Sequence, residues 1–324
     1  MTPPAPYTSH LSIPYPSSSP KNPQNPHHPL QTLDLHTRTP SSPPPRKTHN
    51  ILYIHGGAFR DPRKTSLSLL PSLPKLFANS HIGSVASVNY RLSAYIEEGG
   101  KRREGTEGQE AKWPDHINDV RSAVGFLLDG EGEGEGLAGG AWRGKEWIVV
   151  GHSVGGTMGM MLGLRPLSES KDWGDEERAL PGLKAVVAIA GIYDFGRCRD
   201  AHPAHRGIYD AFTTAAFGAE EEGGWERGNV VKGAREREGR AREGVEVVLV
   251  CGSRGDENVE WEQGERMVGV LGQGNGGKGE GVRVELVEVG GGHDEIVDGG
   301  VVIPEVVGRV VRMLVDRDDG EKEL

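Results

Sequence analysis

A G-x-S-x-G pattern at residues 151–155, centred on Ser153, constrains the fold of this chain more than any other feature. It follows the apolar run 147–150 and precedes the helix-compatible segment 157–164, which predicts a strand, a sharp turn and a helix. Glycines flank the serine because only small neighbours fit so tight a turn, which pushes the hydroxyl out over the sheet. A chance match is the alternative in a chain with 49 glycines, and the strand and helix context argues against it.

An acidic residue and a histidine follow in loops after two later strand-like runs. The apolar run 245–251 leads into a turn-rich loop that ends at Asp256. The alternating run 282–289 leads through three glycines to His293. The chain order Ser153, Asp256, His293 is the one expected of an α/β-hydrolase, and it differs from the chymotrypsin and subtilisin orders.

These three residue types together support nucleophilic catalysis. A serine hydroxyl is a weak nucleophile at neutral pH and needs a base within hydrogen-bond reach. We expect His293 to take the proton, while Asp256 holds the imidazole in the required tautomer and stabilises the imidazolium. A surface loop histidine is the alternative for His293; the alternatives for the acid are Glu257 and, less well placed, Asp294 and Asp298.

The motif at residues 55–59, which reads His-Gly-Gly-Ala-Phe, directly follows the strand-like run 51–54. Glycines let backbone N–H groups approach a carbonyl oxygen as it becomes negative, and each such donor lowers the barrier by roughly 3 kcal/mol. We assign the oxyanion donors to the amides of Gly57, Ala58 and Val154. His55 is expected to shape this turn by hydrogen bonding and not to act as a second base.

These motifs resemble those of the fungal-type kynurenine formamidases, within the esterase and lipase branch of the α/β-hydrolase fold. The family pattern is His-Gly-Gly-any-Trp followed by Asp-Pro, and this sequence reads His55-Gly56-Gly57-Ala58-Phe59-Arg60-Asp61-Pro62. Phe59 stands where the family has Trp, so the aromatic surface is kept and an indole N–H donor is lost. The resemblance runs from about residue 29 to about residue 315, and further similar stretches are 30–35, 89–93, 114–116, 191–194 and 292–295.

The resemblance implies hydrolysis of N-formyl-L-kynurenine to L-kynurenine and formate, a step of tryptophan breakdown that feeds NAD synthesis. Because the formyl group is small, specificity should come from an aryl leaving group with a charged amino-acid tail. Candidates for the pocket lining are Phe59, Asp61, Tyr193 and Phe195. By analogy, the resemblance also implies a homodimer.

Two other functions are compatible with the same residues. A general carboxylesterase of the hormone-sensitive lipase type has the same triad and the same glycine pair, and the Asp61-Pro62 pair favours the formamidase over it. A non-catalytic receptor or scaffold with a hydrolase fold is the third hypothesis. The complete set of Ser153, Asp256 and His293 argues against it.

Strand-like and helix-like runs alternate along the 324 residues and predict an α/β fold: a doubly wound, mostly parallel sheet with helices on both faces. The net charge is −10 and no basic stripe is present, so we expect no nucleic-acid partner. The Arg-rich stretch 227–242 is interleaved with Glu and predicts a solvated helix. No apolar run approaches the length of a membrane span and no secretory segment is evident, which predicts a cytoplasmic enzyme acting on a small molecule.

The chain divides by composition. Residues 1–28 are proline-rich and predict a flexible or extended arm, residues 29–317 the catalytic domain, and residues 318–324 a charged tail. Low-complexity insertions are expected near 97–112 and 130–140, and Leu33, Leu35 and His36 fit a short edge strand. No glycine loop or ligand spacing predicts a cofactor or a metal, since His202 and His205 lack an evident thiolate or carboxylate partner and are assigned to a lid.

Overall fold

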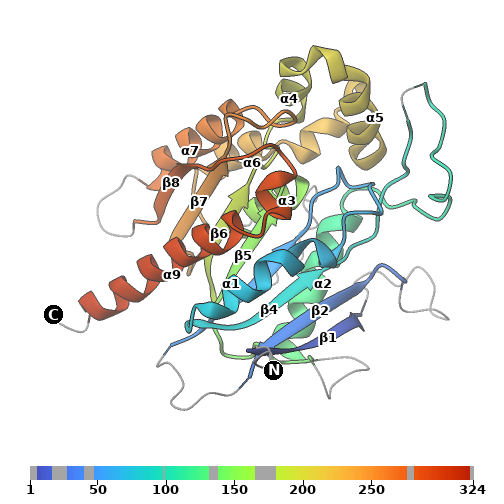
Figure 1. The fold of residues 1–324 in the computed structure, drawn as a ribbon. Helices are drawn as coiled ribbons and strands as arrows, with labels where there is room; N and C mark the ends of the chain where they lie inside the picture. Colours follow the sequence, from blue (N-terminus) through green and yellow to red (C-terminus); the bar gives the residue numbers. More distant parts are fainter. Residues whose placement is uncertain are drawn as a thin grey trace.

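One eight-stranded sheet organises the part of the chain that the computed structural model describes, which comprises residues 6–16, 28–39, 47–97, 99–130, 138–164, 180–275 and 281–321. The strand order is β1-β2-β4-β3-β5-β6-β7-β8 (Figure 1). The strands are β1 (Tyr7–Pro14), β2 (Thr32–Arg38), β3 (His49–Ile54), β4 (Ile82–Val88), β5 (Trp147–His152), β6 (Leu183–Ile189), β7 (Val247–Gly252) and β8 (Arg283–Glu288).

Strand direction divides the sheet into two parts. β1 and β4 each run antiparallel to β2, while every pairing from β4 to β8 is parallel. Parallel strands covered on both faces read as continuous apolar runs, and all residues of β3 and β5 are buried. The carboxyl ends of β5, β7 and β8 therefore point toward one edge of the sheet, which is where such folds place their ligands.

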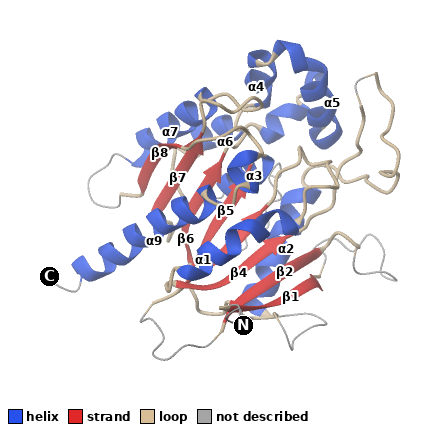
Figure 2. Cartoon of the chain, in the orientation of Figure 1, coloured by secondary structure: helices blue, strands red, loops and turns tan. Residues whose placement is uncertain are grey.

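Helices cover both faces of this sheet (Figure 2). One buried cluster packs α2 and α3 against the sheet, and a second packs α1, α8 and α9 against the opposite face. α4 and α5 lie at one end of the sheet, beyond these two layers (Figure 1). The helices are α1 (Leu73–Ala78), α2 (Asp115–Asp129), α3 (Val154–Gly163), α4 (Phe195–Ala201), α5 (Arg206–Phe217), α6 (Val230–Glu236), α7 (Glu262–Asn275), α8 (Glu295–Asp298) and α9 (Val302–Glu321).

The N-terminal segment departs from the predicted flexible arm. Residues 7–14 form β1, the edge strand, and β2 lies between β1 and β4, so the prediction that Leu33, Leu35 and His36 mark an edge strand is wrong. Tyr15 follows β1, is fully buried, and its hydroxyl donates a hydrogen bond to the carbonyl of Asn89 (2.6 Å). This part of the arm is thus integrated into the sheet.

Two further predicted boundaries shift. The stretch 227–242 is no single solvated helix, because α6 covers only Val230–Glu236 and buries Val230 and Val231. α9 continues to Glu321, so the predicted tail at 318–324 begins inside a helix. The described residues of 97–112 contain no helix or strand, and Arg102 among them forms an isolated bridge with Ile96. Most of the predicted insertion at 130–140 lies outside the described residues.

None of the helices in the described ranges combines the length and the apolar character that crossing a bilayer requires.

Candidate active site

Ser153 occupies the turn between β5 and α3 in a strained conformation, with φ 55° and ψ −127°. A Cβ atom on Gly155 would lie 2.1 Å from the carbonyl oxygen of Ile54, and one on Gly151 would lie 2.1 Å from that of Gly155. Both flanking glycines are therefore required by the close approach of backbone. The turn directs Ser153 to the wall of a cavity at the carboxyl edge of the sheet.

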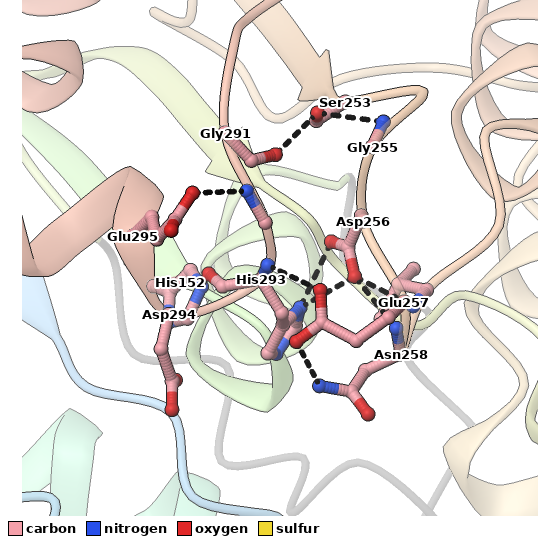
Figure 3. A network of polar contacts seen from close by, with 12 residues as sticks. His152, Ser253, Gly255, Asp256, Glu257, Asn258, Gly291, His293, Asp294 and Glu295 are labelled. Atoms are coloured by element: carbon pink, nitrogen blue, oxygen red, sulfur yellow. Dashed lines mark hydrogen bonds and ion pairs between the residues drawn. The ribbon is translucent and has the colours of Figure 1, made fainter.

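The predicted base and acid contact each other directly (Figure 3). His293 Nδ1 lies 2.9 Å from Asp256 Oδ2 and 3.1 Å from Oδ1. Oδ1 of Asp256 also accepts hydrogen bonds from the backbone N–H groups of Asn258 (2.8 Å) and Val259 (2.9 Å). Because a carboxylate only accepts, Nδ1 carries the proton and the Nε2 lone pair is available as a base. His293 lines the same cavity as Ser153.

The alternative acids have other partners. Glu257 Oε2 accepts a hydrogen bond from the backbone N–H of His293 (3.0 Å), so it holds the loop and not the ring. Asp294 pairs with Lys64 (2.9 Å), and Asp298 lies in α8. Asp256 is thus the carboxylate that contacts the imidazole.

The loop after β3 has an unusual backbone. Gly57, Ala58 and Phe59 all have positive φ, at 98°, 51° and 59°. Residues other than glycine rarely adopt such values. In the described part of the chain, the amide N–H groups of Gly57, Ala58 and Val154 donate to no backbone carbonyl. Gly57 and Ala58 line the cavity beside Ser153, and Val154 is the first residue of α3. That these three amides would bind a negative oxygen stays a prediction from the sequence.

His55 lies behind this loop as a structural residue. Its Nδ1 is 2.8 Å from the carbonyl oxygen of Gly56, and its ring stacks on Tyr90 with 4.4 Å between centroids. The Tyr90 hydroxyl donates to the carbonyls of His55 (3.0 Å) and Gly56 (3.1 Å). Burial lowers the pKa of His55 to about 4, so the imidazole is neutral at pH 7.

The cavity has a volume of about 290 Å³, at the small end of the range of roughly 300–1,000 Å³ found for ligand pockets. Its lining is divided between the loop after β3, the residues around His293, and helix α5. Apart from Ser153 and His293, its main charged and aromatic members are Arg60, Asp61, Lys64, Tyr95, Tyr209, Phe212 and Asp294.

Of the four predicted lining residues, Asp61 lies on the cavity and three do not. Phe59, Tyr193 and Phe195 are at most 1% exposed, and Phe59 packs edge-on against Phe217 with 5.4 Å between ring centroids. These side chains belong to the core beneath the cavity. Arg60, Tyr95, Tyr209 and Phe212 were missed, although Tyr209 and Phe212 are three residues apart on an amphipathic helix, a spacing that places them on one face.

The prediction that His202 lacks a nearby thiol and carboxylate is wrong. One donor atom each from Cys198, His202 and Glu260 lies within 4.8 Å of the others. Burial raises the pKa of the Cys198 thiol well above its usual value, and this thiol donates to the carbonyl of Asn258 (3.6 Å). His202 Nδ1 lies 2.8 Å from the carbonyl oxygen of Cys198. The cluster ties α4 to the loop that carries Asp256.

The strand order, with β2 antiparallel to its neighbours, and the positions of Ser153, Asp256 and His293 after β5, β7 and β8 define an α/β-hydrolase. The BD-FAE family model matches residues 33–223, and a kynurenine formamidase-like hydrolase (fscH) of Fusarium equiseti is 30% identical over 277 residues, which cover 82% of this chain and 84% of that protein. The chain belongs to the BD-FAE family and is a kynurenine formamidase-like α/β-hydrolase.

The chain is also similar to another curated relative and to solved structures. The kynurenine formamidase avaC of Aspergillus versicolor is 32% identical over 45% of this chain, and the match spans 44% of its own length. Esterase B from Lactobacillus rhamnosis, in an inhibited form, has a TM-score of 0.68 at 13% identity and covers 99% of this chain and 91% of its own. A Rhizomucor miehei esterase has a TM-score of 0.62 at 15% identity, covering 96% and 85%. At these identities the two structures establish the fold alone.

Proposed function

We propose that this chain hydrolyses N-formyl-L-kynurenine to L-kynurenine and formate, and that it thereby serves tryptophan breakdown and NAD synthesis. The observation that carries the proposal is the pair of Asp256 and His293, whose Nδ1 and Oδ2 atoms are 2.9 Å apart, on the same cavity as the elbow serine. The names of the kynurenine formamidase and kynurenine formamidase-like relatives support the choice of substrate.

In the first half of the reaction, the Ser153 hydroxyl attacks the formyl carbon while His293 Nε2 accepts its proton. The negative oxygen that forms receives hydrogen bonds from the amides of Gly57, Ala58 and Val154. The C–N bond then breaks, and the proton on His293 passes to the departing aryl amine. The products of this half are a formyl ester on Ser153 and L-kynurenine.

In the second half, His293 takes a proton from a water molecule, which attacks the formyl ester. The same amides bind the second tetrahedral oxyanion. When the ester bond breaks, the proton returns to Ser153 and formate leaves. Asp256 stabilises the imidazolium that forms twice in each turnover.

The size of the cavity is consistent with a small acyl group and a compact leaving group. At about 290 Å³ it has little room for a long acyl chain beside an aryl ring. A general carboxylesterase is the second candidate function, favoured by the esterases among the structural neighbours. The cytoplasmic location and the homodimer stay predictions from the sequence.

The experiment that separates these candidates compares kcat/KM for N-formyl-L-kynurenine and p-nitrophenyl butyrate, with Ser153→Ala measured beside the unaltered enzyme. We expect a strong preference for the formamide and a loss of nearly all turnover in Ser153→Ala, because the hydroxyl is the nucleophile. A serine-dependent preference for the ester would instead establish the carboxylesterase. Retained formamide hydrolysis in Ser153→Ala would overturn the assignment of the nucleophile.

A further inference from the structure

Arg60 is a nearly buried cation on the wall of the cavity that holds Ser153 and His293. The residue is only 5% exposed, and it follows directly on the loop of Gly57 and Ala58. A buried guanidinium is costly unless an anion or several acceptors compensate its charge. The contacts of Arg60 therefore indicate which kind of ligand the cavity can bind.

Backbone and aromatic groups position the guanidinium but do not neutralise it. Nη1 of Arg60 donates to the carbonyl of Ile96. The guanidinium carbon lies 4.3 Å from the ring centroid of Tyr95 and 5.7 Å from that of Phe212, and both rings also line the cavity. Among the described residues, no carboxylate oxygen lies within 4.0 Å of its nitrogens. The guanidinium is thus held in place without a direct carboxylate partner among the described residues, and Asp61 and Glu97 act on its charge from a longer distance.

The neighbouring cations, unlike Arg60, each pair with a carboxylate. Lys64 on the cavity wall pairs with Asp294 (2.9 Å), and Arg63 pairs with Asp61 (2.8 Å). Burial lowers the pKa of Arg60, the direction expected for a cation that has lost water without gaining a full counter-charge. Arg60 stays protonated at neutral pH all the same, because an arginine pKa begins far above it.

We propose that Arg60 is the carboxylate-binding residue of the cavity and that it selects formamide substrates whose leaving group bears an α-carboxylate. The inference rests on the proposed function and adds a determinant of its specificity. A guanidinium fork matches a carboxylate with two parallel N–H···O bonds, which fixes the orientation of the substrate as well as binding it. The rings of Tyr95 and Phe212, which lie next to the guanidinium, would shield such an ion pair from water.

The test uses two formamides that differ only in the tail. N-formyl-L-kynurenine carries the amino-acid tail, and 2-formamidoacetophenone has the same aryl formamide without it. We expect the unaltered enzyme to prefer the first by about 100-fold in kcat/KM, because a desolvated charged pair contributes that much or more. Arg60→Gln should reduce this preference to within about 10-fold, mainly through KM for the substrate with the tail.

Arg103→Gln is the matched control. Its guanidinium carbon lies 4.6 Å from the centroid of the same Tyr95 ring, but the side chain is 38% exposed and Arg103 is not among the residues lining the cavity. The preference for the tail should be unchanged in Arg103→Gln. An equal fall in both variants would mean that stacking on Tyr95 matters and the carboxylate contact does not, which overturns the proposal.

Binding separates this inference from the proposed function. In the Ser153→Ala background, L-kynurenine should bind at least about 30-fold more tightly than 2-aminoacetophenone, and Arg60→Gln should remove that difference. If the enzyme hydrolyses neither formamide, the proposed function fails and this binding comparison alone decides the inference. If the unaltered enzyme treats both formamides alike, the inference fails while the formamidase activity stands. Should Arg60→Gln not fold, the comparisons on the unaltered enzyme and on Ser153→Ala decide.

Discussion

The carboxylate of Asp256 is fixed in position by several hydrogen bonds. Its side chain is 1% exposed, and its oxygens receive two backbone N–H groups in addition to the ring of His293. Those amides compensate the charge without competing for the proton of the imidazole. Glu257, one residue later, accepts hydrogen bonds from the backbone N–H of His293 and the side-chain amide of Asn258.

We predict that removing the charge of Asp256 lowers kcat far more than removing the charge of Glu257. Asp256→Asn should lower kcat by about 10³- to 10⁴-fold, because the amide no longer favours the tautomer with a proton on Nδ1. Glu257→Gln should cost less than about 10-fold, since its contact positions the loop. Steady-state kinetics on both variants, with circular dichroism to verify the fold, provides the measurement. Equal losses in the two variants would contradict the assignment of Asp256 as the acid.

The sequence predicted that Ser153, Asp256 and His293 lie close together, and it did not predict most of the residues that line the cavity. Ser153, Asp256 and His293 each follow a recognisable strand, so their chain order carries their spatial relation. The direction of a side chain from an irregular loop has no such signal. At Phe59 a φ of 59° turns the ring into the core, and the adjacent Arg60, not Phe59, reaches the cavity.

At the scale of elements, β1 is the clearest departure from what the sequence predicts. Its burial pattern contains one buried residue, Ile13, because an antiparallel edge strand with one solvated face needs few apolar side chains. The prolines around it favour an extended arm equally well. By contrast, β5 and α3 were predicted correctly as elements, since a fully buried strand followed by a glycine-rich turn has few other interpretations.

Tyr15 should anchor β1 to the domain. We expect Tyr15→Ala to lower the free energy of unfolding by about 3–5 kcal/mol, because it removes a fully buried aromatic ring and leaves a cavity. Leu11→Ala in the same strand, where the side chain is 56% exposed, should change it by less than about 0.5 kcal/mol. Urea unfolding of both variants measures the difference. A Tyr15→Ala protein as stable as Leu11→Ala would mean that Tyr15 does not anchor β1.

At the scale of the whole molecule, buried neutral histidines should make stability depend on pH. Burial lowers the pKa of His55 to about 4 and that of His116 to about 3, from an ordinary value near 6.5. Below about pH 6.5, these two histidines therefore bind protons in the unfolded chain but stay neutral in the folded protein. Their contribution is complete above about pH 6.5 and is lost as the pH falls toward the folded pKa values.

We predict that the free energy of unfolding falls between pH 7.5 and pH 5, by on the order of 2 kcal/mol for each of these two histidines. His116→Gln should reduce that pH sensitivity by its own share, since glutamine does not titrate while its amide can still meet the Ser93 hydroxyl that His116 contacts at 2.9 Å. Urea denaturation at the two pH values gives the comparison. An unchanged pH sensitivity in His116→Gln would contradict the prediction.

Asn258 joins two parts of the molecule. Its N–H donates to Asp256, and its carbonyl accepts from the Tyr209 hydroxyl of α5 and the Cys198 thiol of α4. Helix α4 and helix α5, which lines the cavity, are therefore both hydrogen-bonded to the turn that carries Asp256. We expect a ligand bulky enough to displace α5 to shift this turn as well, and thereby to weaken the contact between Asp256 and His293.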